Sequence, residues 1–463
     1  MTTPAELEAL CLQARADFPV FAAHPNRPEF LRAVAAGLEA AVDDLVALAT
    51  RETYLPEGRS RMETGRTAGQ LRMFADLAAS GQWREPLRVP ADPTLTPPRP
   101  DMRRMLTALG PVAVFGASNF PLAFSVAGGD TASAWAVGCP VLAKAHPAHP
   151  ETCRRVAQVI ADAAQATGMP AGAFALVEGD IEIGQALVQD PAITAVGFTG
   201  SQAAGRALFD LAAARPTPIP VYAEMGSVNP LVILPDALHR EGLAASLAGS
   251  ITLGVGQFCT KPGLILTVES DALPSFSERL KDALQAVAPA PLLHPGIAAH
   301  FATRAHEFSA TGVTATVSPH VADNAASAGL WITTSDEFRA HPTLSEEIFG
   351  PAAVMVVCTS VEDLLATLAT LPGQLTGSLH FDDAGPAAEA VLQSLAARCG
   401  RLVINGFPTG VAVNAATVHG GPYPATTAPG TTSVGTEAFR RWTRLVCYQD
   451  CPESLLPEPL KSL

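Results

Sequence analysis

Short apolar runs that alternate with amphipathic stretches dominate the chain from residue 110 onward. The runs at 112–115, CPVLAKA at 139–145 and AVGFTG at 195–200 are short, whereas the stretch from Pro150 to Ala166 repeats its apolar residues at helical spacing. A short run that is apolar throughout is typical of a parallel strand buried on both faces, and the helix between two such strands supplies the crossover. The alternation therefore predicts an α/β fold built from βαβ units.

The segments outside this alternation divide the chain. Before residue 85, apolar residues recur at steps of three and four, which predicts helices. The proline-rich residues 84–101 then interrupt regular structure, and residues 443–449 alternate like a strand whose partner we expect near 101–109. A second α/β region is expected from near Tyr222. A chain of 463 residues is longer than one core usually supports, so we expect more than one domain.

Charge and cysteine content argue against several classes of protein. The formal net charge of −14 disfavours general binding of nucleic acid or of an anionic membrane surface. No run of about 18 apolar residues lacks polar or helix-breaking residues, and the N-terminal stretch is acidic rather than basic, so we expect a cytoplasmic protein. The eight cysteines are sparse and irregularly spaced, which predicts neither a disulfide framework nor a metal site.

Three polar residues stand where predicted strands end or where glycines cluster. Cys259 lies in the glycine-rich GVGQFCTKPG, which suits a nucleophile on a loop, although such a cysteine alone is more often structural. Glu224 ends an apolar strand, where a partly desolvated carboxylate can act as a general base, although helix capping and ion pairing are commoner roles. Asn119 follows the strand at 112–115, where its amide could hold an oxyanion or only shape a turn.

Further residues suggest a phosphate-bearing ligand. Gly200 and Ser201 end the run AVGFTG and open a helix that carries Gly205, so free N–H groups at that helix start could face a pyrophosphate. The spacing is not that of the GxGxxG fingerprint, and an ordinary glycine-capped helix start would look the same. Lys144 follows the run CPVLA and could donate to phosphate or ribose, or simply be solvated.

Taken together and in this order, these segments resemble those of the aldehyde dehydrogenase superfamily. GASNFP is similar to the family's oxyanion segment, AEMGSVNP to its general-base segment and GQFCTKPG to its cysteine segment. VLAKAHPAHP is similar to the cofactor-ribose segment, GFTGS to the pyrophosphate-binding turn, EEIFGP to the segment at the nicotinamide ribose, and INGFP, with Asn405, to a segment near the active site. The similarity runs from residue 27 to residue 450, nearly the whole chain.

The resemblance implies a Rossmann-type cofactor domain, an α/β catalytic domain and a small β excursion through which subunits assemble as homodimers or homotetramers. The implied boundaries place the cofactor domain at 1–88 and 109–222, the catalytic domain at 223–428, and the oligomerisation segment at 89–108 and 429–463. The implied reaction oxidises a small-molecule aldehyde to a carboxylic acid, with NADP or NAD as cofactor, through a thiohemiacetal and a thioester on the cysteine.

The same resemblance implies roles for individual residues. Cys259 would be the nucleophile, Glu224 the general base for water and Asn119 a donor to the oxyanion. The residues implied for the cofactor are Lys144, His146, Gly200, Ser201, Gly205, Glu347 and Phe349. Those expected at the substrate are Phe120, Arg66 and Arg72. No metal ion is implied.

Two departures from the family pattern affect these expectations. Where many members have Gly-Gly-Lys after the base, this chain has Gly226, Ser227 and Val228, so the lysine of that motif is missing. Where NAD-specific members carry a glutamate for the adenosine ribose, this chain has Pro147, with His146 beside it. Since that glutamate would repel a 2'-phosphate, its absence makes NADP plausible alongside or instead of NAD.

Several segments are most similar to the branch that contains 2,5-dioxopentanoate (alpha-ketoglutarate semialdehyde) dehydrogenases and NADP-dependent fatty aldehyde dehydrogenases. Oxidation of 2,5-dioxopentanoate to 2-oxoglutarate is the expected reaction, with a medium- or long-chain fatty aldehyde as the alternative. Arg66 and Arg72 could bind a substrate carboxylate or form surface ion pairs. Parts of the pattern would also fit acyl transfer to coenzyme A, an acyl-phosphate reductase, or a catalytically silent binding or scaffold protein.

Overall fold

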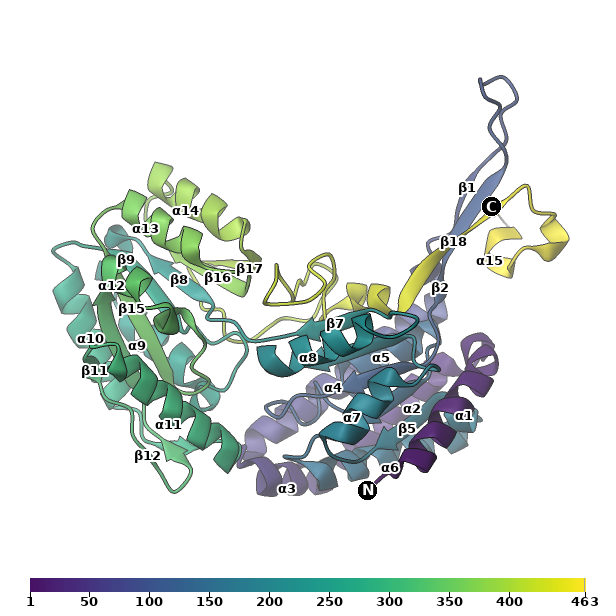
Figure 1. Ribbon diagram of the computed structural model, residues 1–463, viewed down its shortest axis with the longest axis horizontal. Coiled ribbons are helices and arrows are strands. Elements are labelled where there is room, and N and C mark those ends of the chain that lie inside the picture. Colours follow the sequence, from purple (N-terminus) through teal and green to yellow (C-terminus); the bar gives the residue numbers. More distant parts are fainter. Residues whose placement is uncertain (462) are drawn as a thin grey trace.

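The computed structural model describes residues 1–461 and 463 (Figure 1). Its first sheet has five parallel strands in the order β5-β4-β3-β6-β7. The strands are β3 (Val112–Phe115), β4 (Val141–Lys144), β5 (Phe174–Val177), β6 (Ala195–Thr199) and β7 (Val221–Glu224). The helices between successive strands are α5 (Gly129–Val137), α6 (Pro150–Thr167), α7 (Ile181–Gln189) and α8 (Gln202–Ala213). The predicted βαβ alternation is confirmed.

Four N-terminal helices pack beside this sheet: α1 (Pro4–Ala23), α2 (Arg27–Ala40), α3 (Val42–Thr53) and α4 (Glu57–Ser80). They pack because apolar residues at three- and four-residue steps form one buried face, as at Phe30, Leu31, Val34 and Leu38 of α2. The Phe30 ring lies 4.8 Å from that of Trp135, which is fully buried in α5. Among the described residues, no helix combines the length and the apolar content that a membrane span requires.

The second sheet has seven strands in the order β11-β14-β15-β9-β8-β16-β17. They are β8 (Pro230–Ile233), β9 (Leu264–Val268), β11 (Ala315–Val317), β14 (Gly329–Thr334), β15 (Ala352–Cys358), β16 (Gln374–His380) and β17 (Cys399–Ile404). All neighbours are parallel except the edge pair β11 and β14. Since β7 pairs with β6, the expected domain boundary between residues 222 and 223 falls inside a strand of the first sheet.

Helices cover both faces of the second sheet. Successive residues of its strands point to opposite faces, so they belong to two different hydrophobic cores. Val232, Leu264 and Val354 belong to one core, and Leu231 and Ile265 to the other. The helices are α9 (Leu243–Thr252), α10 (Leu273–Gln285), α11 (Pro295–Ala310), α12 (Ser335–Ala340), α13 (Val361–Thr370) and α14 (Pro386–Ala396). A small separate sheet contains β10 (Ala290–Pro291), β12 (Val321–Ala322) and β13 (Ala325–Ala326).

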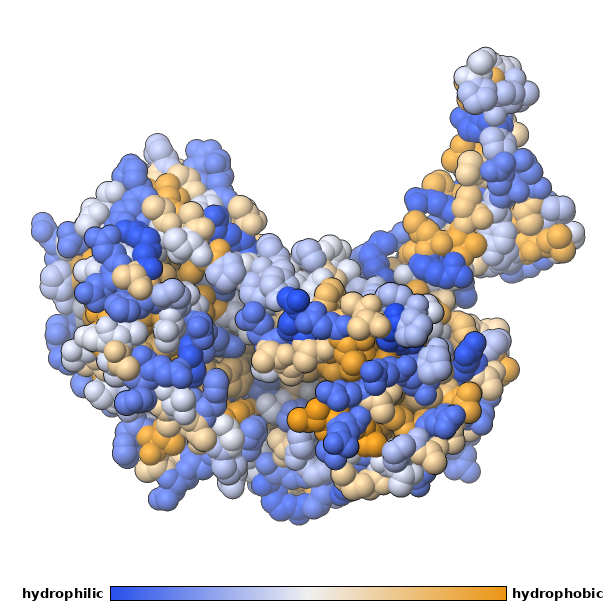
Figure 2. Space-filling view, viewed as in Figure 1, coloured by the Kyte–Doolittle hydropathy of each residue, from blue (hydrophilic) through white to orange (hydrophobic). Residues whose placement is uncertain are grey.

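An antiparallel arm projects from the body (Figure 1). It consists of β1 (Leu87–Val89), β2 (Met102–Ala108) and β18 (Thr443–Gln449), with the short helix α15 (Glu458–Lys461) against it. The pairing of β18 with β2 is the one expected from the sequence. Figure 2 shows apolar surface on the arm, and Leu445 of β18 is 53% exposed.

The segment that follows β17 returns from the second sheet to the first and links the two. The Met225 amide donates to the Ala425 carbonyl, and the Thr427 amide donates to the Ala223 carbonyl, so this segment runs beside β7. Further along, η6 (Thr436–Trp442) buries Trp442 in the core of the first domain. The C-terminal segment therefore fixes the two α/β units against each other.

A buried ion pair secures this return. Arg441 Nη2 lies 2.6 Å from Asp130 Oδ1 of α5, and the two side chains are 2% and 10% exposed. We predict that Asp130→Ala costs about 3–5 kcal/mol of stability, because it leaves the arginine charge buried and unpaired. The matched control is Asp210→Ala, which breaks the half-exposed pair with Arg206 and should cost about 0–1 kcal/mol. Unfolding midpoints in urea measure both, and equal midpoints would contradict the prediction.

Candidate active site

Cys259 is presented by a strained turn. It follows η4 (Leu253–Gly256), in which Gly254, Val255 and Gly256 all have positive φ. A Cβ on Gly256 would lie 2.1 Å from the Gly350 carbonyl oxygen, so no larger residue fits there. Left-handed backbone at a β-branched residue such as Val255 costs about 1–2 kcal/mol. Strain of this kind concentrates where a reactive group must be held in place.

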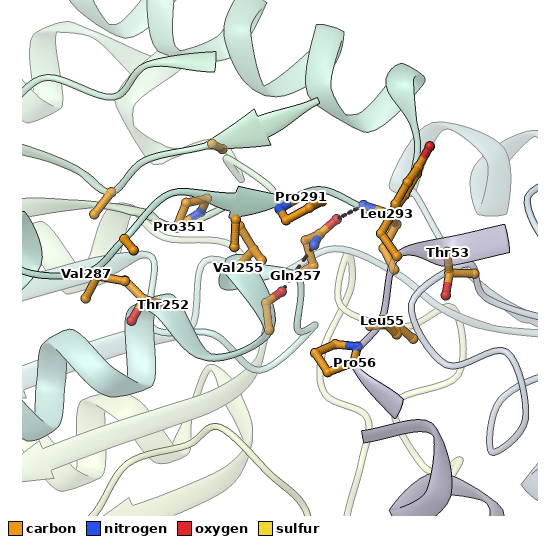
Figure 3. A pocket seen from close by; sticks show the side chains of 16 residues that line it. Thr53, Leu55, Pro56, Thr252, Val255, Gln257, Val287, Pro291, Leu293 and Pro351 are labelled. Carbon is orange, nitrogen blue, oxygen red and sulfur yellow. Dashed lines mark hydrogen bonds between the residues drawn. The ribbon is translucent and has the colours of Figure 1, made fainter. Parts of the chain in front are cut away.

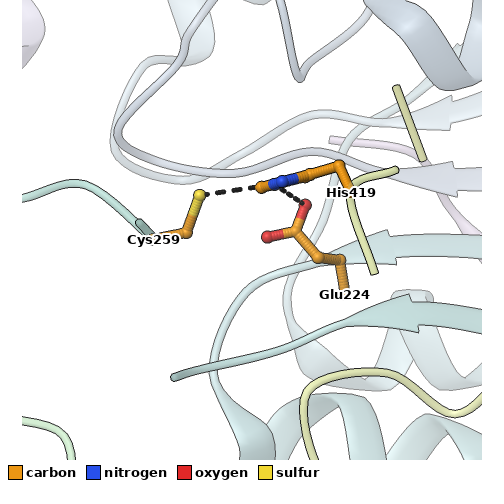
Figure 4. Close-up of side chains that lie close together, drawn as sticks. All are labelled: Glu224, Cys259 and His419. Atoms are coloured by element: carbon orange, nitrogen blue, oxygen red, sulfur yellow. Dashed lines mark hydrogen bonds and ion pairs between the residues drawn. The ribbon is translucent and has the colours of Figure 1, made fainter. Parts of the chain in front are cut away.

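Three functional groups from distant segments meet at this turn (Figure 4). Cys259 Sγ lies 3.5 Å from His419 Nε2, which lies 3.0 Å from Glu224 Oε2. The side chains of His419 and Glu224 are 1% and 4% exposed, whereas Cys259 keeps partial exposure. Glu224 ends β7, Cys259 precedes β9, and His419 lies in the return segment after β17. The cluster therefore exists only when both α/β units are in contact.

The surroundings of Cys259 keep its thiol protonated. Burial raises the pKa of the Cys259 thiol well above its ordinary value, and the nearby Glu224 carboxylate raises it further. Arg66 opposes this shift through its positive charge. Because the thiolate is the nucleophile, the thiol must lose its proton before it reacts. His419 Nε2 donates to Glu224 Oε2 at 3.0 Å and cannot also accept this proton, which the partly exposed sulfur can lose to water.

Asn119 is held in the same wall by a loop that α4 anchors. Its Nδ2 donates to the Gln257 carbonyl at 3.0 Å, two residues before Cys259. The loop after Asn119 is fixed because Glu63 Oε1 accepts the amides of Leu122 and Ala123, each at 2.9 Å. The structure therefore brings Asn119 beside the cysteine turn, and the amide has the chemistry of an oxyanion donor.

The start of α8 fits a phosphate group. Ser201 caps the helix, its Oγ accepting the Ala204 amide at 3.3 Å, and Gly200 and Ser201 are exposed. Gly205 lies against the strand-end segment, since a Cβ there would lie 2.8 Å from the Met225 side chain. Exposed N–H groups at a helix N-terminus attract an anion.

Lys144 and His146 follow the neighbouring strand β4. Lys144 Nζ donates to the Ala145 carbonyl at 3.0 Å. The His146 ring stacks on that of His149, with centroids 5.0 Å apart, and burial lowers the pKa of His146 to about 3. His146 is therefore neutral at neutral pH and offers hydrogen bonds rather than a positive charge.

The EEIFGP segment places Glu347 against Gly226 of the AEMGSVNP segment. A Cβ on Gly226 would lie 2.3 Å from Glu347 Oε2, so the missing side chain leaves room for this carboxylate. Burial raises the pKa of Glu347 to about 7, while the positive charge of Lys261 lowers it and Glu224 raises it. Phe349 follows in the same segment and is half-buried.

Two arginines of α4 face the site across aromatic rings. The Arg66 guanidinium lies 5.8 Å from the ring centre of Phe120 and 5.6 Å from that of Phe124. Its Nε and Nη2 atoms are buried with no hydrogen-bond partner among the described residues. Arg59 lies 4.4 Å from the centre of the Phe120 ring and 4.8 Å from that of Phe258. Arg59 pairs with Glu63 at 3.5 Å, whereas the free N–H donors of Arg66 suit an anionic ligand.

The structure does not bring Arg72 to this cluster. Its guanidinium binds Glu39 of α2 at 2.6 and 2.5 Å, and both side chains are about half exposed. Six residues along a helix correspond to a rotation of about 120° from Arg66, so the two side chains leave different faces of α4. The sequence left two alternatives for Arg72, a substrate contact or a surface ion pair, and the structure shows the surface ion pair.

A cavity of about 270 Å³ lies behind the cysteine turn (Figure 3). Its wall combines Leu55 and Pro56, before α4, with Val255, Pro291 and Gln257. The Gln257 side chain crosses the turn: its Oε1 accepts the Leu293 amide at 2.9 Å and its Nε2 donates to the Gly254 carbonyl at 3.1 Å. The backbone of Gln257 faces the site, so its side chain holds the turn from the rear.

Sequence reasoning missed four residues of the site: His419, Arg59, Glu63 and Lys261. His419 lies in VHGGPYP, where the pair of glycines was the only available sign. Arg59 and Glu63 share a helix face with Arg66, a pattern that the spacing 59, 63 and 66 contains. The ligand atoms of Glu224, Cys259 and His419 lie within 4.8 Å of one another and could hold a metal ion, so the expectation of no metal stays a prediction.

A thiol in contact with an imidazole, where two α/β units meet and a nearby helix start exposes its N–H groups, is the arrangement of an enzyme that forms a covalent bond through cysteine. The profile of the aldehyde dehydrogenase family matches residues 1–444. The chain belongs to the aldehyde dehydrogenase family and is an NAD(P)-dependent aldehyde oxidoreductase. The family and fold class predicted from the sequence are confirmed.

Individual relatives agree with this assignment. Alpha-ketoglutaric semialdehyde dehydrogenase 2 of Azospirillum brasilense is 47% identical, over 99% of this chain and 89% of that protein. Alpha-ketoglutaric semialdehyde dehydrogenase of Acinetobacter baylyi is 42% identical, over 94% of this chain and 84% of that protein. The lactaldehyde dehydrogenase structure from Escherichia coli superposes with a TM-score of 0.83 at 22% identity, over 97% and 92% of the two chains, and shows the common fold.

The effect of Glu224 on the thiol can be tested without substrate. We predict that Glu224→Gln speeds alkylation of Cys259 by iodoacetamide about tenfold at neutral pH, because the carboxylate raises the pKa of the thiol and one pKa unit changes the thiolate fraction tenfold. The rate is measured by peptide mass spectrometry, and the exposed Cys447 of the same chain serves as an internal control. An unchanged or lower ratio of the two rates would show that Glu224 does not raise the pKa of the thiol.

Proposed function

We propose that the chain oxidises 2,5-dioxopentanoate, a semialdehyde that carries a 2-oxo acid group, to 2-oxoglutarate. The observation that carries this proposal is the unpartnered guanidinium of Arg66, which lies beside the rings of Phe120 and Phe124 near the nucleophile. These two rings are called the aromatic wall. A buried arginine without a partner is costly, and a substrate carboxylate would satisfy it. The two curated relatives act on the same semialdehyde by name, which supports the choice over a fatty aldehyde.

The first step is addition of the thiol to the aldehyde. The partly exposed Cys259 thiol loses its proton to solvent, and the thiolate sulfur forms a bond to the aldehyde carbon. The aldehyde oxygen becomes an oxyanion, for which the Asn119 amide and the Cys259 backbone N–H are the donors. The product is a thiohemiacetal on Cys259.

The second step is oxidation to a thioester. When bound, the nicotinamide ring of NAD(P) supplies the oxidant that removes the hydrogen from the thiohemiacetal carbon. The helix start at Gly200, Ser201 and Gly205 would hold its pyrophosphate, and Lys144 with His146 its adenosine side. Glu347 and Phe349 would hold the nicotinamide ribose and ring.

The last step is hydrolysis. The Glu224 carboxylate removes a proton from water, which attacks the thioester carbon. The carbon–sulfur bond breaks, and the leaving thiolate takes the proton that Glu224 removed from water. The carboxylic acid loses its proton to solvent and departs as its anion.

The cofactor site is compatible with a 2'-phosphate. Pro147 is exposed where a carboxylate would repel that phosphate, so we include NADP alongside NAD in the proposal. His146 is neutral and would bind a phosphate by hydrogen bonding. Initial rates with NAD and NADP over a panel of semialdehydes and alkanals decide the preference.

We also propose that the arm assembles the chain into a homodimer or homotetramer. β18 is an edge strand of the three-stranded arm and carries the exposed Leu445. Unpaired edge strands bind other strands readily. Sedimentation of the purified chain, with an arm variant such as Leu445→Asp, measures the assembly.

Arg66 gives the sharpest test of the substrate. We predict that Arg66→Ala lowers kcat/KM for 2,5-dioxopentanoate about 10- to 100-fold, the value of a lost charge-assisted contact, and lowers that for hexanal far less. The matched control is Arg72→Ala on the same helix, which should leave both substrates unchanged. An equal loss for both aldehydes with Arg66→Ala would remove the carboxylate role.

A further inference from the structure

Lys261 is a buried cation that the proposed reaction does not use. It lies two residues after Cys259 and is 1% exposed. Its Nζ donates to the Ile348 carbonyl at 2.8 Å and to the Ala352 carbonyl at 2.7 Å. Ile348 lies between Glu347 and Phe349, and Ala352 lies three residues after Phe349. One side chain thus ties the nucleophile turn to the EEIFGP segment.

A buried ammonium group needs a negative charge nearby as well as acceptors for its N–H bonds. The two carbonyls accept two of the three N–H bonds of Lys261, and Glu347 is the acidic group that raises its pKa against the effect of burial. Conversely, the positive charge of Lys261 is the largest influence that keeps Glu347 ionised. Removing Glu347 would leave the buried Lys261 charge without its counterpart, and removing Lys261 would leave the half-buried Glu347 without the positive charge that lowers its pKa.

The sequence departs from the family pattern beside this lysine. The general-base segment carries Val228 where many family members have a lysine, so it brings no positive charge of its own. Lys261 reaches the end of the same segment from the nucleophile turn. Its Nζ lies 3.3 Å from the position of a Cβ on Gly263, whose amide donates to the Val228 carbonyl at 2.8 Å.

We propose that Lys261 is a positioning residue for the cofactor. Its hydrogen bonds fix the segment that carries Glu347 and Phe349, and its charge keeps the Glu347 carboxylate ionised so that it can accept the hydroxyl groups of the nicotinamide ribose. The inference rests on the proposed role of Glu347. It gives Lys261 a function in cofactor affinity rather than in the attack of the thiol.

This role has a consequence for pH. The pKa of Glu347 is about 7 in the presence of Lys261, so the carboxylate becomes protonated and cofactor affinity falls as pH drops through that value. The other ionisable groups that face it are Glu224, which raises its pKa, and the Cys259 thiol. Without Lys261 the pKa of Glu347 rises further, so the loss of affinity must begin at higher pH.

The experiment is calorimetric titration of the full chain with NADP and, separately, NAD between pH 6 and pH 9. The Lys261→Met variant should bind about tenfold more weakly at pH 7, with its midpoint moved up by about one pH unit. Lys261→Gln keeps a donor for the carbonyls and loses only the charge, so it should show the same shift. If Lys261→Met does not fold, the midpoint of Lys261→Gln alone tests the inference.

Two controls separate the possible failures. Lys281→Met removes a lysine at the surface of α10 and should leave affinity and midpoint unchanged. Glu347→Gln should abolish the pH dependence near 7, and an unaltered profile would instead refute the role of Glu347 on which the inference rests. If Glu347→Gln behaves as expected but Lys261→Gln keeps the original midpoint, the inference about Lys261 is overturned.

Discussion

The contact of the His419 imidazole with the Glu224 carboxylate is the interaction on which the site depends. Both side chains are almost wholly buried, and the third member, Cys259, has a thiol whose pKa is raised by that burial and by Glu224. Burying a charged group is costly unless it is paired and hydrogen-bonded. The three groups therefore form one unit, in which His419 holds the Glu224 carboxylate beside the sulfur.

This unit explains why the return segment after β17 matters as much as the sheets. Glu224 comes from the first sheet, Cys259 from the turn before β9 of the second, and His419 from the segment that runs back beside β7. Lys261 and Glu63 hold two further segments at the edge of the site. Lys261 donates to the Ile348 carbonyl, and Glu63 accepts the Leu122 amide. The chemistry is thus built at the contact between two folding units.

Much of this could be predicted from the sequence. Cys259, Glu224 and Asn119 lie in short motifs whose order along the chain is informative, and apolar runs marked the parallel strands. His419 could not be predicted from periodicity, because its segment has no regular structure and its position depends on how the chain returns to β7. Arg66 and Arg72 were equivalent in sequence, and only the packing of α4 separated the face toward the aromatic wall from the face toward α2.

The central claim is that Cys259 carries a thioester that Glu224 then helps water to cleave. Its most direct measurement is the intact mass of the Glu224→Gln variant after mixing with 2,5-dioxopentanoate and NADP or NAD. The account predicts one equivalent of reduced cofactor and an acyl adduct that maps to Cys259 and persists. Steady turnover at the wild-type rate, or a reduced cofactor burst with no adduct on Cys259, would contradict it.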